Sequence, residues 1–261
     1  MVGKDLIMAT LFGSGGGSSG SGGGGGWPEA PDDGKTRLYI TLAEGRTSPM
    51  LGVGVNGTVT VDWGDGTEPD VLTGTKASSI QWTPNHAYAT PGDYVITLTV
   101  DGEMGMRGGT GSDANTYFLR HASSGSDTRN RAYRTALQRV VIGSGVTSIG
   151  MSTFGSCYGL ASVTIPESVT SIGSNAFSNC STLTSAKIPE GVTSIENNVF
   201  SYCYGMVFYD FTTHTAVPTL ANASAFSGLP SDCEIRVPAA LYDEWIAATN
   251  WATYASQIKA Y

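Results

Sequence analysis

Two short motifs in the sequence match patterns that hold phosphates or nucleophiles. The stretch GVGVNG, Gly52 to Gly57, has the G-x-G-x-x-G spacing of a dinucleotide-binding loop, and GGSSG, Gly16 to Gly20, has the G-x-S-x-G spacing of a serine hydrolase. A strand is predicted after the first motif, so no helix N-terminus would receive a pyrophosphate. The second motif lies in a glycine and serine tract that cannot hold a nucleophile in place. We therefore expect no catalysis from either motif.

Four acidic residues surround the sequence WGDG and offer oxygen ligands to a cation: Asp62, Asp65, Glu68 and Asp70. Carboxylates at a tight turn are ligands that Ca²⁺ prefers. The alternative is a solvated acidic loop in which Asp65 caps its own turn. Calcium thus stays an open interpretation, and we expect no other metal or cofactor. The histidines, at 86, 121 and 214, have no cysteine or second histidine at the spacing of zinc ligands.

Charge and hydropathy exclude several classes of function. The formal net charge is −8, and charged residues make up only 14% of the chain. Lysine and arginine form no cluster, so we expect no nucleic-acid partner. No apolar run of 18 residues is present, so we expect no membrane insertion. Paired carboxylates, a catalytic triad and a metal set are missing from the motifs, and we expect a protein that is not an enzyme.

The chain opens with a short apolar segment ahead of a flexible tract. Residues 1–12 carry the apolar side chains Leu6, Ile7, Met8, Leu11 and Phe12. Gly13 to Gly26 contains only glycine and serine, with an r.m.s. span of roughly 20 Å, and we expect a flexible linker over residues 13–34. The apolar run is short and ends in glycine, so we predict no secretory signal. We interpret residues 1–12 as a segment that docks on another subunit.

Residues 35–102 alternate between apolar and polar residues, as half-buried strands do. The sequences VTVDWGDGT (Val59 to Thr67), HAY (His86 to Tyr88) and PGDYVITLTV (Pro91 to Val100) resemble a PKD domain, although WGDG lacks the usual phenylalanine before its first glycine. This resemblance implies an immunoglobulin-like β-sandwich that acts as a spacer or adhesion module. Residues 103–136 are expected to form an irregular connector and N-terminal cap.

Residues 137–205 repeat with a period of 23. Leu137, Leu160 and Leu183 begin the three copies, and isoleucine, valine and phenylalanine positions match in each. One copy cannot bury its apolar residues alone, so stacked copies must form a continuous core. A matching cysteine recurs at 157, 180 and 203. We predict a buried column of thiols, with disulfides between turns as the alternative.

The second copy, IPESVTSIGSNAFSNC, resembles the BspA-like leucine-rich repeats that occur in bacterial surface proteins and gut-phage proteins. We assign these repeats to residues 137–233. Residues 234–261 are predicted to form a cap of one strand, Glu234 to Val237, and a helix whose apolar face covers the last repeat. The predicted fold class is mainly β: an immunoglobulin-like (PKD) sandwich, a short leucine-rich-repeat β-solenoid and a C-terminal capping helix.

Aromatic and polar side chains on the repeats are candidates for recognition. Tyr158, Tyr202 and Tyr204 fall near the cysteine-containing turn, where other copies have serine or asparagine, and packing between turns is the alternative role. Arg139, Thr164 and Lys187 should point outward from strands by alternation. These residues are the predicted contacts to a glycan or protein of a host surface.

The modules together indicate display and adhesion. Our first interpretation is an accessory, fibre-like protein of a phage virion, held to another virion subunit by residues 1–12 and presented on the virion surface. The alternative is a leucine-rich-repeat adhesin of a bacterial cell surface or the extracellular space. Display on a repeated lattice would strengthen weak contacts through avidity.

Overall fold

The computed structural model describes residues 27–44, 47–106, 118–121 and 127–261. Met1–Pro31 and Asp32–Tyr261 are separate units. Residues 27–31, the described part of the first unit, contain no helix or strand. The predicted docking residues Leu6, Ile7, Met8, Leu11 and Phe12, and the linker up to residue 26, lie outside the described residues.

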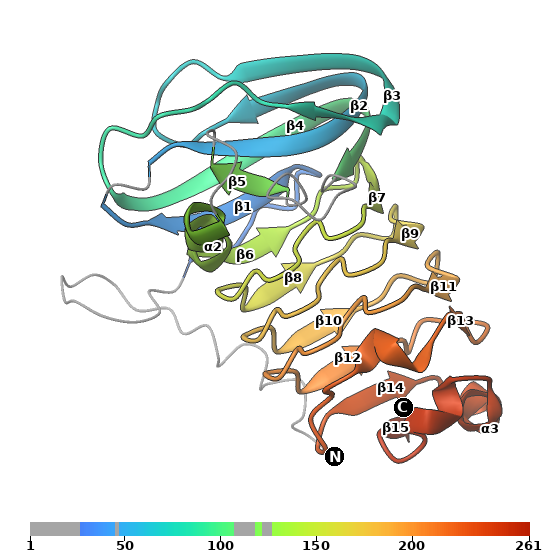
Figure 1. The fold of residues 1–261 in the computed structure, drawn as a ribbon. Coiled ribbons are helices and arrows are strands. Elements are labelled where there is room, and N and C mark those ends of the chain that lie inside the picture. The colour runs from blue at the N-terminus through green and yellow to red at the C-terminus, as the bar shows by residue number, and fades with distance from the viewer. Residues whose placement is uncertain (1–26, 45–46, 107–117, 122–126) are drawn as a thin grey trace. The chain divides into compact units, whose positions relative to one another are not determined.

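Long antiparallel strands form the first part of the second unit (Figure 1). Their bounds are β1 Thr36–Leu42, β2 Pro49–Asp62, β3 Asp70–Trp82 and β4 Gly92–Met106. Alternating β-branched and aromatic residues favour the extended backbone, and hydrogen bonds set the order β3-β2-β4-β1. Gly57 of β2 lies opposite Gly102 of β4, with φ angles of 115° and 111°. A Cβ on Gly57 would lie 2.2 Å from the carbonyl oxygen of Asp101, so this close approach requires glycine.

This region differs from the predicted sandwich of two sheets over residues 35–102. Its described strands belong to one hydrogen-bonded network that extends into the repeats. β1 pairs antiparallel with β6 (Leu137–Val141), and the end of β4 pairs parallel with β7 (Val146–Ile149). Met104 and Met106 are fully buried. Strand β4 therefore continues past residue 102, where we expected a connector, because its extension buries these side chains against the first repeat.

The connector also contains a helix that the sequence analysis missed. Strand β5 (Leu119–His121) pairs with β2, and helix α2 (Asp127–Ala136) contacts both β5 and β1. Ala132, Tyr133 and Ala136 are buried. The expectation of an irregular cap fails here because the apolar face of α2 consists of one tyrosine and small alanines, which produce a weak periodic signal in a polar segment.

The repeats wind through two columns of short parallel strands. The first column contains β6, β8 Ser162–Thr164, β10 Ser185–Lys187, β12 Phe208–Asp210 and β14 Glu234–Val237; the second contains β7, β9 Ser171–Ile172, β11 Ser194–Ile195 and β13 Thr219–Leu220. In β6 and β8, Arg139 pairs with Ser162, and in β10 and β12, Ser185 pairs with Phe208. Both pairs are 23 residues apart, so the predicted period is confirmed.

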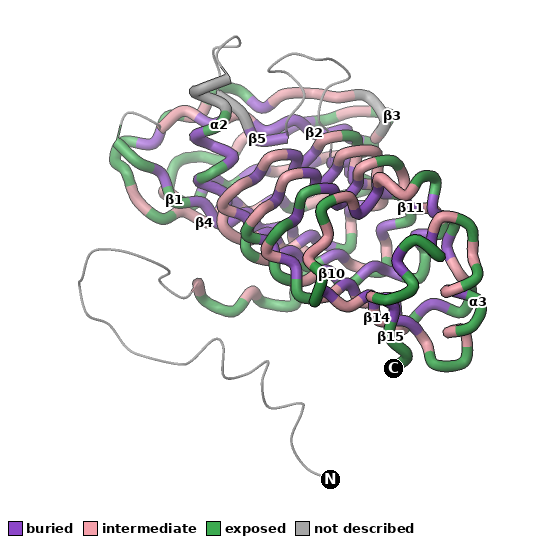
Figure 2. The backbone as a smooth tube through the Cα atoms, turned by 60° about the horizontal axis from the view of Figure 1, so that its bottom comes forward, coloured by how far each residue is buried: buried purple, intermediate pink, exposed green. Residues whose placement is uncertain are grey.

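A stack of phenylalanine rings runs through the interior of the turns. Phe154, Phe177, Phe200 and Phe226 are buried, and their successive ring centroids lie 5.3, 5.3 and 5.7 Å apart. Figure 2 shows how buried residues recur from turn to turn. Because each turn contributes one layer, the rings leave water only when neighbouring turns stack.

A cap of several short elements closes the last turn. After β14, which matches the predicted strand, come η2 Ala239–Leu241, α3 Tyr242–Ala247, η3 Trp251–Tyr254 and β15 Ile258–Ala260. The predicted capping helix is therefore confirmed only over the six residues of α3, and the rest of the cap consists of shorter elements. Helix α3 ends at Ala247 because Ala248 is extended, with a ψ of 144°. Asn250, with a left-handed φ of 65°, precedes η3, and this break lets Trp245 and Trp251 pack with ring centroids 4.6 Å apart. None of the described helices is long and apolar enough to cross a membrane.

Candidate binding surface on the repeat turns

A left-handed backbone position recurs two residues after the stacked phenylalanine in each turn. Ser156, Asn179, Tyr202 and Gly228 occupy this position, with φ angles of 58°, 60°, 60° and 76°. Glycine tolerates this conformation without cost, and asparagine tolerates it better than most residues. Tyrosine has no such tolerance. Tyr202 is therefore a residue whose side chain the local backbone does not favour.

The thiols one residue later form the predicted buried column, which the structure confirms. Cys157, Cys180 and Cys203 are buried and reduced. The Sγ of Cys180 donates to the carbonyl of Phe154 at 3.1 Å, and the Sγ of Cys203 donates to the carbonyl of Phe177 at 3.2 Å. Burial raises the pKa of Cys157 and of Cys203 to about 12. The thiols are thus protonated at neutral pH and serve as hydrogen-bonding core residues.

Tyr202 and Tyr204 present an exposed pair of aromatic rings. Their exposed fractions are 44% and 62%, and their ring centroids lie 6.0 Å apart. The η1 segment (Ala223–Phe226) leads into Gly228 of the next turn, and a Cβ there would lie 2.9 Å from Tyr202 and 3.2 Å from Tyr204. The amide of Tyr202 donates to the carbonyl of Ser227. The rings thus lie against the backbone of the next turn, which glycine leaves open.

Tyr158, the third predicted tyrosine, does not join this pair. It occupies the same repeat position as Tyr204 two turns earlier, and Ser181 stands between them in the series. Parallel turns are spaced by about 4.8 Å, so the two positions are roughly 10 Å apart. The guanidinium of Arg131 lies 5.0 Å from the ring centroid of Tyr158. One face of this tyrosine is therefore already covered.

The predicted polar residues on the strands point outward, as alternation required. Thr164 and Lys187 are exposed, and Arg139 is half-buried. The Nζ of Lys187 lies 3.1 Å from Glu167 Oε1, and the guanidinium of Arg139 lies 5.0 Å from the ring centroid of Tyr39. These cations are paired within the chain, so this strand face has no concentrated positive charge to attract an anion.

Asp65 of the WGDG turn is engaged with neighbouring side chains. Its Oδ2 lies 2.9 Å from His86 Nε2, and its Oδ1 accepts hydrogen bonds from the amide and hydroxyl of Thr67. His86 also stacks on Trp63, with centroids 4.5 Å apart. Burial by itself would raise the pKa of Asp65, but the hydrogen bonds from Thr67 and His86 outweigh it and lower that pKa. Asp65 therefore stabilises its own turn.

The other acidic candidates do not form one group of ligands with Asp65. Asp62 accepts a hydrogen bond from the amide of Gly64, Asp70 accepts one from the indole of Trp63, and Glu68 is exposed. Within the described ranges, no three histidine, cysteine, aspartate or glutamate side chains lie close enough to share a metal ion. The structure favours the alternative interpretation, a hydrogen-bonded acidic turn.

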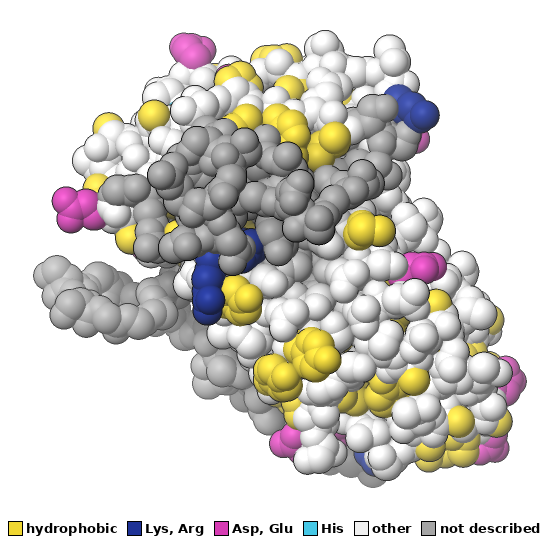
Figure 3. All heavy atoms as spheres, viewed as in Figure 1, with side chains coloured by type: hydrophobic (Ala, Val, Ile, Leu, Met, Phe, Trp, Pro, Cys, Tyr) yellow, Lys and Arg dark blue, Asp and Glu magenta, His cyan; other side chains and the backbone are white. Residues whose placement is uncertain are grey.

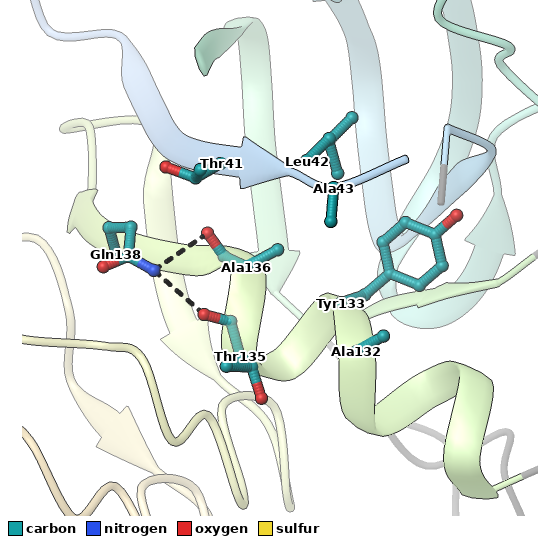
Figure 4. A pocket seen from close by; sticks show the side chains of 8 residues that line it. All are labelled: Thr41, Leu42, Ala43, Ala132, Tyr133, Thr135, Ala136 and Gln138. Carbon is teal, nitrogen blue, oxygen red and sulfur yellow. Dashed lines mark hydrogen bonds between the residues drawn. The ribbon is translucent and has the colours of Figure 1, made fainter. Parts of the chain in front are cut away.

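A small pocket lies between the end of β1 and helix α2 (Figure 4). Its volume is about 230 Å³, below the usual range for small-molecule sites. The amide of Gln138 points to the carbonyls of Thr135 and Ala136 and donates to both, and the Tyr133 hydroxyl accepts from the amide of Ser48. These polar groups already form hydrogen bonds within the chain. The exposed pair Tyr202 and Tyr204 is therefore a stronger candidate for a ligand-binding site than this pocket.

Sequence reasoning missed Gly228 as part of this surface. The signal is present in the fourth, degenerate turn, where Ala225-Phe226 can be aligned with Ala176-Phe177. That alignment places Gly228 two residues after the phenylalanine, at the position of Tyr202. The positive φ at this position could be found only from the structure, because serine, asparagine and tyrosine, which occupy it in the other turns, share no obvious backbone preference.

The fold and this surface define a repeat protein whose stacked turns display side chains at a regular spacing. Comparison with protein families identifies the repeats: residues 129–241 match the BspA type leucine rich repeat region, in six copies. The resemblance that the sequence showed to these repeats is thereby confirmed. Comparison with curated proteins finds no match.

Three solved structures illustrate similar proteins. A leucine-rich repeat protein from Bacteroides ovatus is 23% identical, with 49% of this chain and 31% of that chain covered and a TM-score of 0.38. The T. pallidum protein TpLRR is 23% identical, with 40% and 53% covered and a TM-score of 0.32. A protein from Eubacterium ventriosum is 24% identical, with 54% and 41% covered and a TM-score of 0.30. The match thus spans about a third to a half of each of these proteins.

Proposed function

We propose that this chain is a non-enzymatic adhesion protein of a bacterial cell surface. The observation that carries the proposal is the run of BspA type repeats over residues 129–241, whose turns display the exposed pair Tyr202 and Tyr204. Such repeats resemble those of bacterial surface proteins. The family match favours this alternative over the virion interpretation, which depended on residues 1–12.

The arrangement of the strands supports a role in attachment to another surface. The long strands and the repeats share hydrogen-bonded strands, so a force on one part is carried directly to the other. In the proposal, the PKD-like region of residues 35–102 is a spacer that holds the repeats away from the attachment point. The repeats then offer their turns to a glycan or protein on a host surface.

Localisation in the native organism tests the proposal. Antibody labelling of intact cells and protease treatment of the cell exterior should both detect the protein, and deleting its gene should reduce attachment to host cells or mucus. Detection only inside the cells, with attachment unchanged, would rule out the adhesive role. Detection in purified phage particles would instead restore the virion interpretation, in which deletion of residues 1–12 should abolish incorporation.

The absence of catalysis is a separate part of the proposal. Incubation of purified protein with a panel of glycans should yield bound complexes and no cleavage products by mass spectrometry. Release of products at a rate that scales with protein concentration would overturn it.

A further inference from the structure

We propose that Tyr202 and Tyr204 form a stacking platform for a neutral saccharide. The inference rests on the proposed adhesive function and names the class of ligand at its surface. It depends on two exposed rings, on a turn that holds them in place and on neighbouring repeat stretches that contain no charged residue.

The rings are placed before any ligand arrives. Tyr202 has a φ of 60° and is bonded through its amide to Ser227 of the next turn. Both rings lie against Gly228, where any Cβ would contact them. A tyrosine has only two side-chain torsions, and a ring already held by the backbone loses little entropy on binding. The two exposed rings therefore provide a large contact area at a small loss of conformational entropy on binding.

The repeat stretches around the rings contribute no charged side chain. Residues 151–161, 174–184, 197–207 and 221–231, the stretches that follow one another at this side of the stack, include no aspartate, glutamate, lysine or arginine. Hydrogen bonds from Asn179 to Ser201 and from Tyr202 to Ser227 place three of them side by side. In Figure 3, much of one face of the repeats is white or yellow, the colours of hydrophobic side chains and of atoms that belong to no charged side chain. In a chain of net charge −8, this surface offers an ionic ligand no counter-charge.

A neutral saccharide matches both properties of the surface. Its C–H faces are apolar and stack on aromatic rings, and its hydroxyls pair with the groups nearby, which include exposed Thr182 and half-exposed Asn179 and Ser181. A stable protein partner would need about 800 Å² on each side. Beyond the two rings, Val207 is the exposed large hydrophobic residue nearest in sequence. The patch is therefore of the size of one or two sugar rings.

The preceding turn supplies the variant that tests this platform. Asn179 and Ser181 occupy the positions of Tyr202 and Tyr204, so the double variant Tyr202→Asn, Tyr204→Ser copies residues that the fold already accepts. The probes are an array of neutral and of sialylated or sulfated oligosaccharides, followed by calorimetric titration of the best neutral one. Circular dichroism confirms that the variant is folded. Tyr158→Ser is the matched control, because Arg131 already covers that ring.

Wild-type protein should bind neutral oligosaccharides, the double variant should bind them at least about tenfold more weakly, and Tyr158→Ser should bind as wild type. No binding of any neutral oligosaccharide by the wild type, equal binding by the double variant, or selective binding of the charged probes would each overturn the inference.

Adhesion to host cells or mucus, before and after enzymatic deglycosylation, separates this inference from the proposed function. If wild type and double variant both attach to the deglycosylated surface, adhesion stands and the saccharide platform is wrong, because a protein receptor is recognised. If the wild type binds neutral oligosaccharides through the tyrosines but attaches to neither surface, the platform stands and the adhesive role is wrong.

Discussion

At the scale of single residues, Tyr202 has a side chain that its own backbone disfavours. The equivalent residue of the preceding turn is Asn179, at the same φ of 60°. Residues in such disfavoured conformations cluster at functional sites, where the surrounding structure holds them in place. The unfavourable backbone conformation of Tyr202 is therefore consistent with selection for its exposed ring.

The single substitution Tyr202→Asn should raise the free energy of unfolding by about 1 kcal/mol, because asparagine accepts the left-handed backbone. Urea unfolding of the purified protein measures this change. Tyr204→Ser, at a residue without a positive φ, is the control and should change stability by less than about 0.5 kcal/mol. A clear loss of stability in Tyr202→Asn would show that the ring contributes to packing.

His214 is a second residue whose surroundings have a measurable consequence. It is 4% exposed and packs against Phe211 and Trp245. Burial lowers its pKa below the ordinary 6.5, although the carboxylates of Glu190 and Glu167 act in the opposite direction. As the pH falls below 6.5, the unfolded chain therefore binds a proton that the folded chain does not, and stability decreases.

Through His214, the free energy of unfolding should decrease by at most about 1.4 kcal/mol for each pH unit below 6.5. The decrease should stop once the pH is below the lowered pKa of the folded state. Urea unfolding at pH 7.5 and pH 5 measures it. His214→Gln, which cannot be protonated in this range, should show a smaller decrease between the two values. An identical decrease in both proteins would show that other groups cause the acid sensitivity.

At the scale of elements, the shortest strands of the repeats, such as β9, bury a single inward side chain. Ile172 of β9 is 1% exposed, whereas its neighbour Ser171 is exposed. Ile172→Asp should lower the free energy of unfolding by about 3 kcal/mol or more, since it buries a carboxylate without a partner. Thermal unfolding measures this, and Ser171→Asp, on the outward face, should melt close to wild type. Equal melting temperatures for all three proteins would contradict the layered core.

The long strands β2 and β4 depend instead on a close backbone approach. Gly57→Ala should destabilise the protein by more than about 1 kcal/mol, because its Cβ would meet the Asp101 carbonyl oxygen at 2.2 Å. Gly66→Ala is a matched control: its φ is 81°, but a Cβ there would meet no atom within 4 Å. The difference in the free energy of unfolding between the two variants, measured by urea unfolding, gives the contribution of the steric clash between the new Cβ and the Asp101 carbonyl. Equal effects would mean that the strands move apart freely.

At the scale of the whole molecule, the long strands serve as the N-terminal end of the repeat stack. Gly143 donates to the hydroxyl of Thr36, and β6 and β7 pair with β1 and β4. Neighbouring layers that share hydrogen bonds unfold together. Residues 32–261 should therefore unfold in one cooperative transition.

A fragment of residues 137–261 tests this coupling. It would expose Leu137, Val140 and Ile149, which are buried in the intact chain, and should be much less stable than residues 32–261 in urea unfolding followed by circular dichroism. Equal stability of the fragment, or two separate transitions in the longer chain, would show that the two parts fold independently.

Sequence reasoning succeeded where the pattern is local and repeated. The 23-residue period, the phenylalanine layers and the column of Cys157, Cys180 and Cys203 follow from matched positions, because each turn packs on a copy of itself. It missed helix α2, and in the C-terminal cap it predicted the helix but not the shorter elements that follow α3. In both, residues far apart in the chain decide the structure: α2 rests on β1 and β5, and Trp251 donates from its indole to the carbonyl of Pro218.

The order of the residues was enough to predict a layered repeat core, because the core follows from the types of neighbouring residues and from their period. Two features could be found only in the folded chain: the first strands join the repeats in one sheet, and Tyr202 has a left-handed conformation against Gly228. Strand pairing and the placement of a ring depend on contacts between segments that are far apart in the chain. A pattern of neighbouring residues therefore does not reveal how much such contacts stabilise the fold.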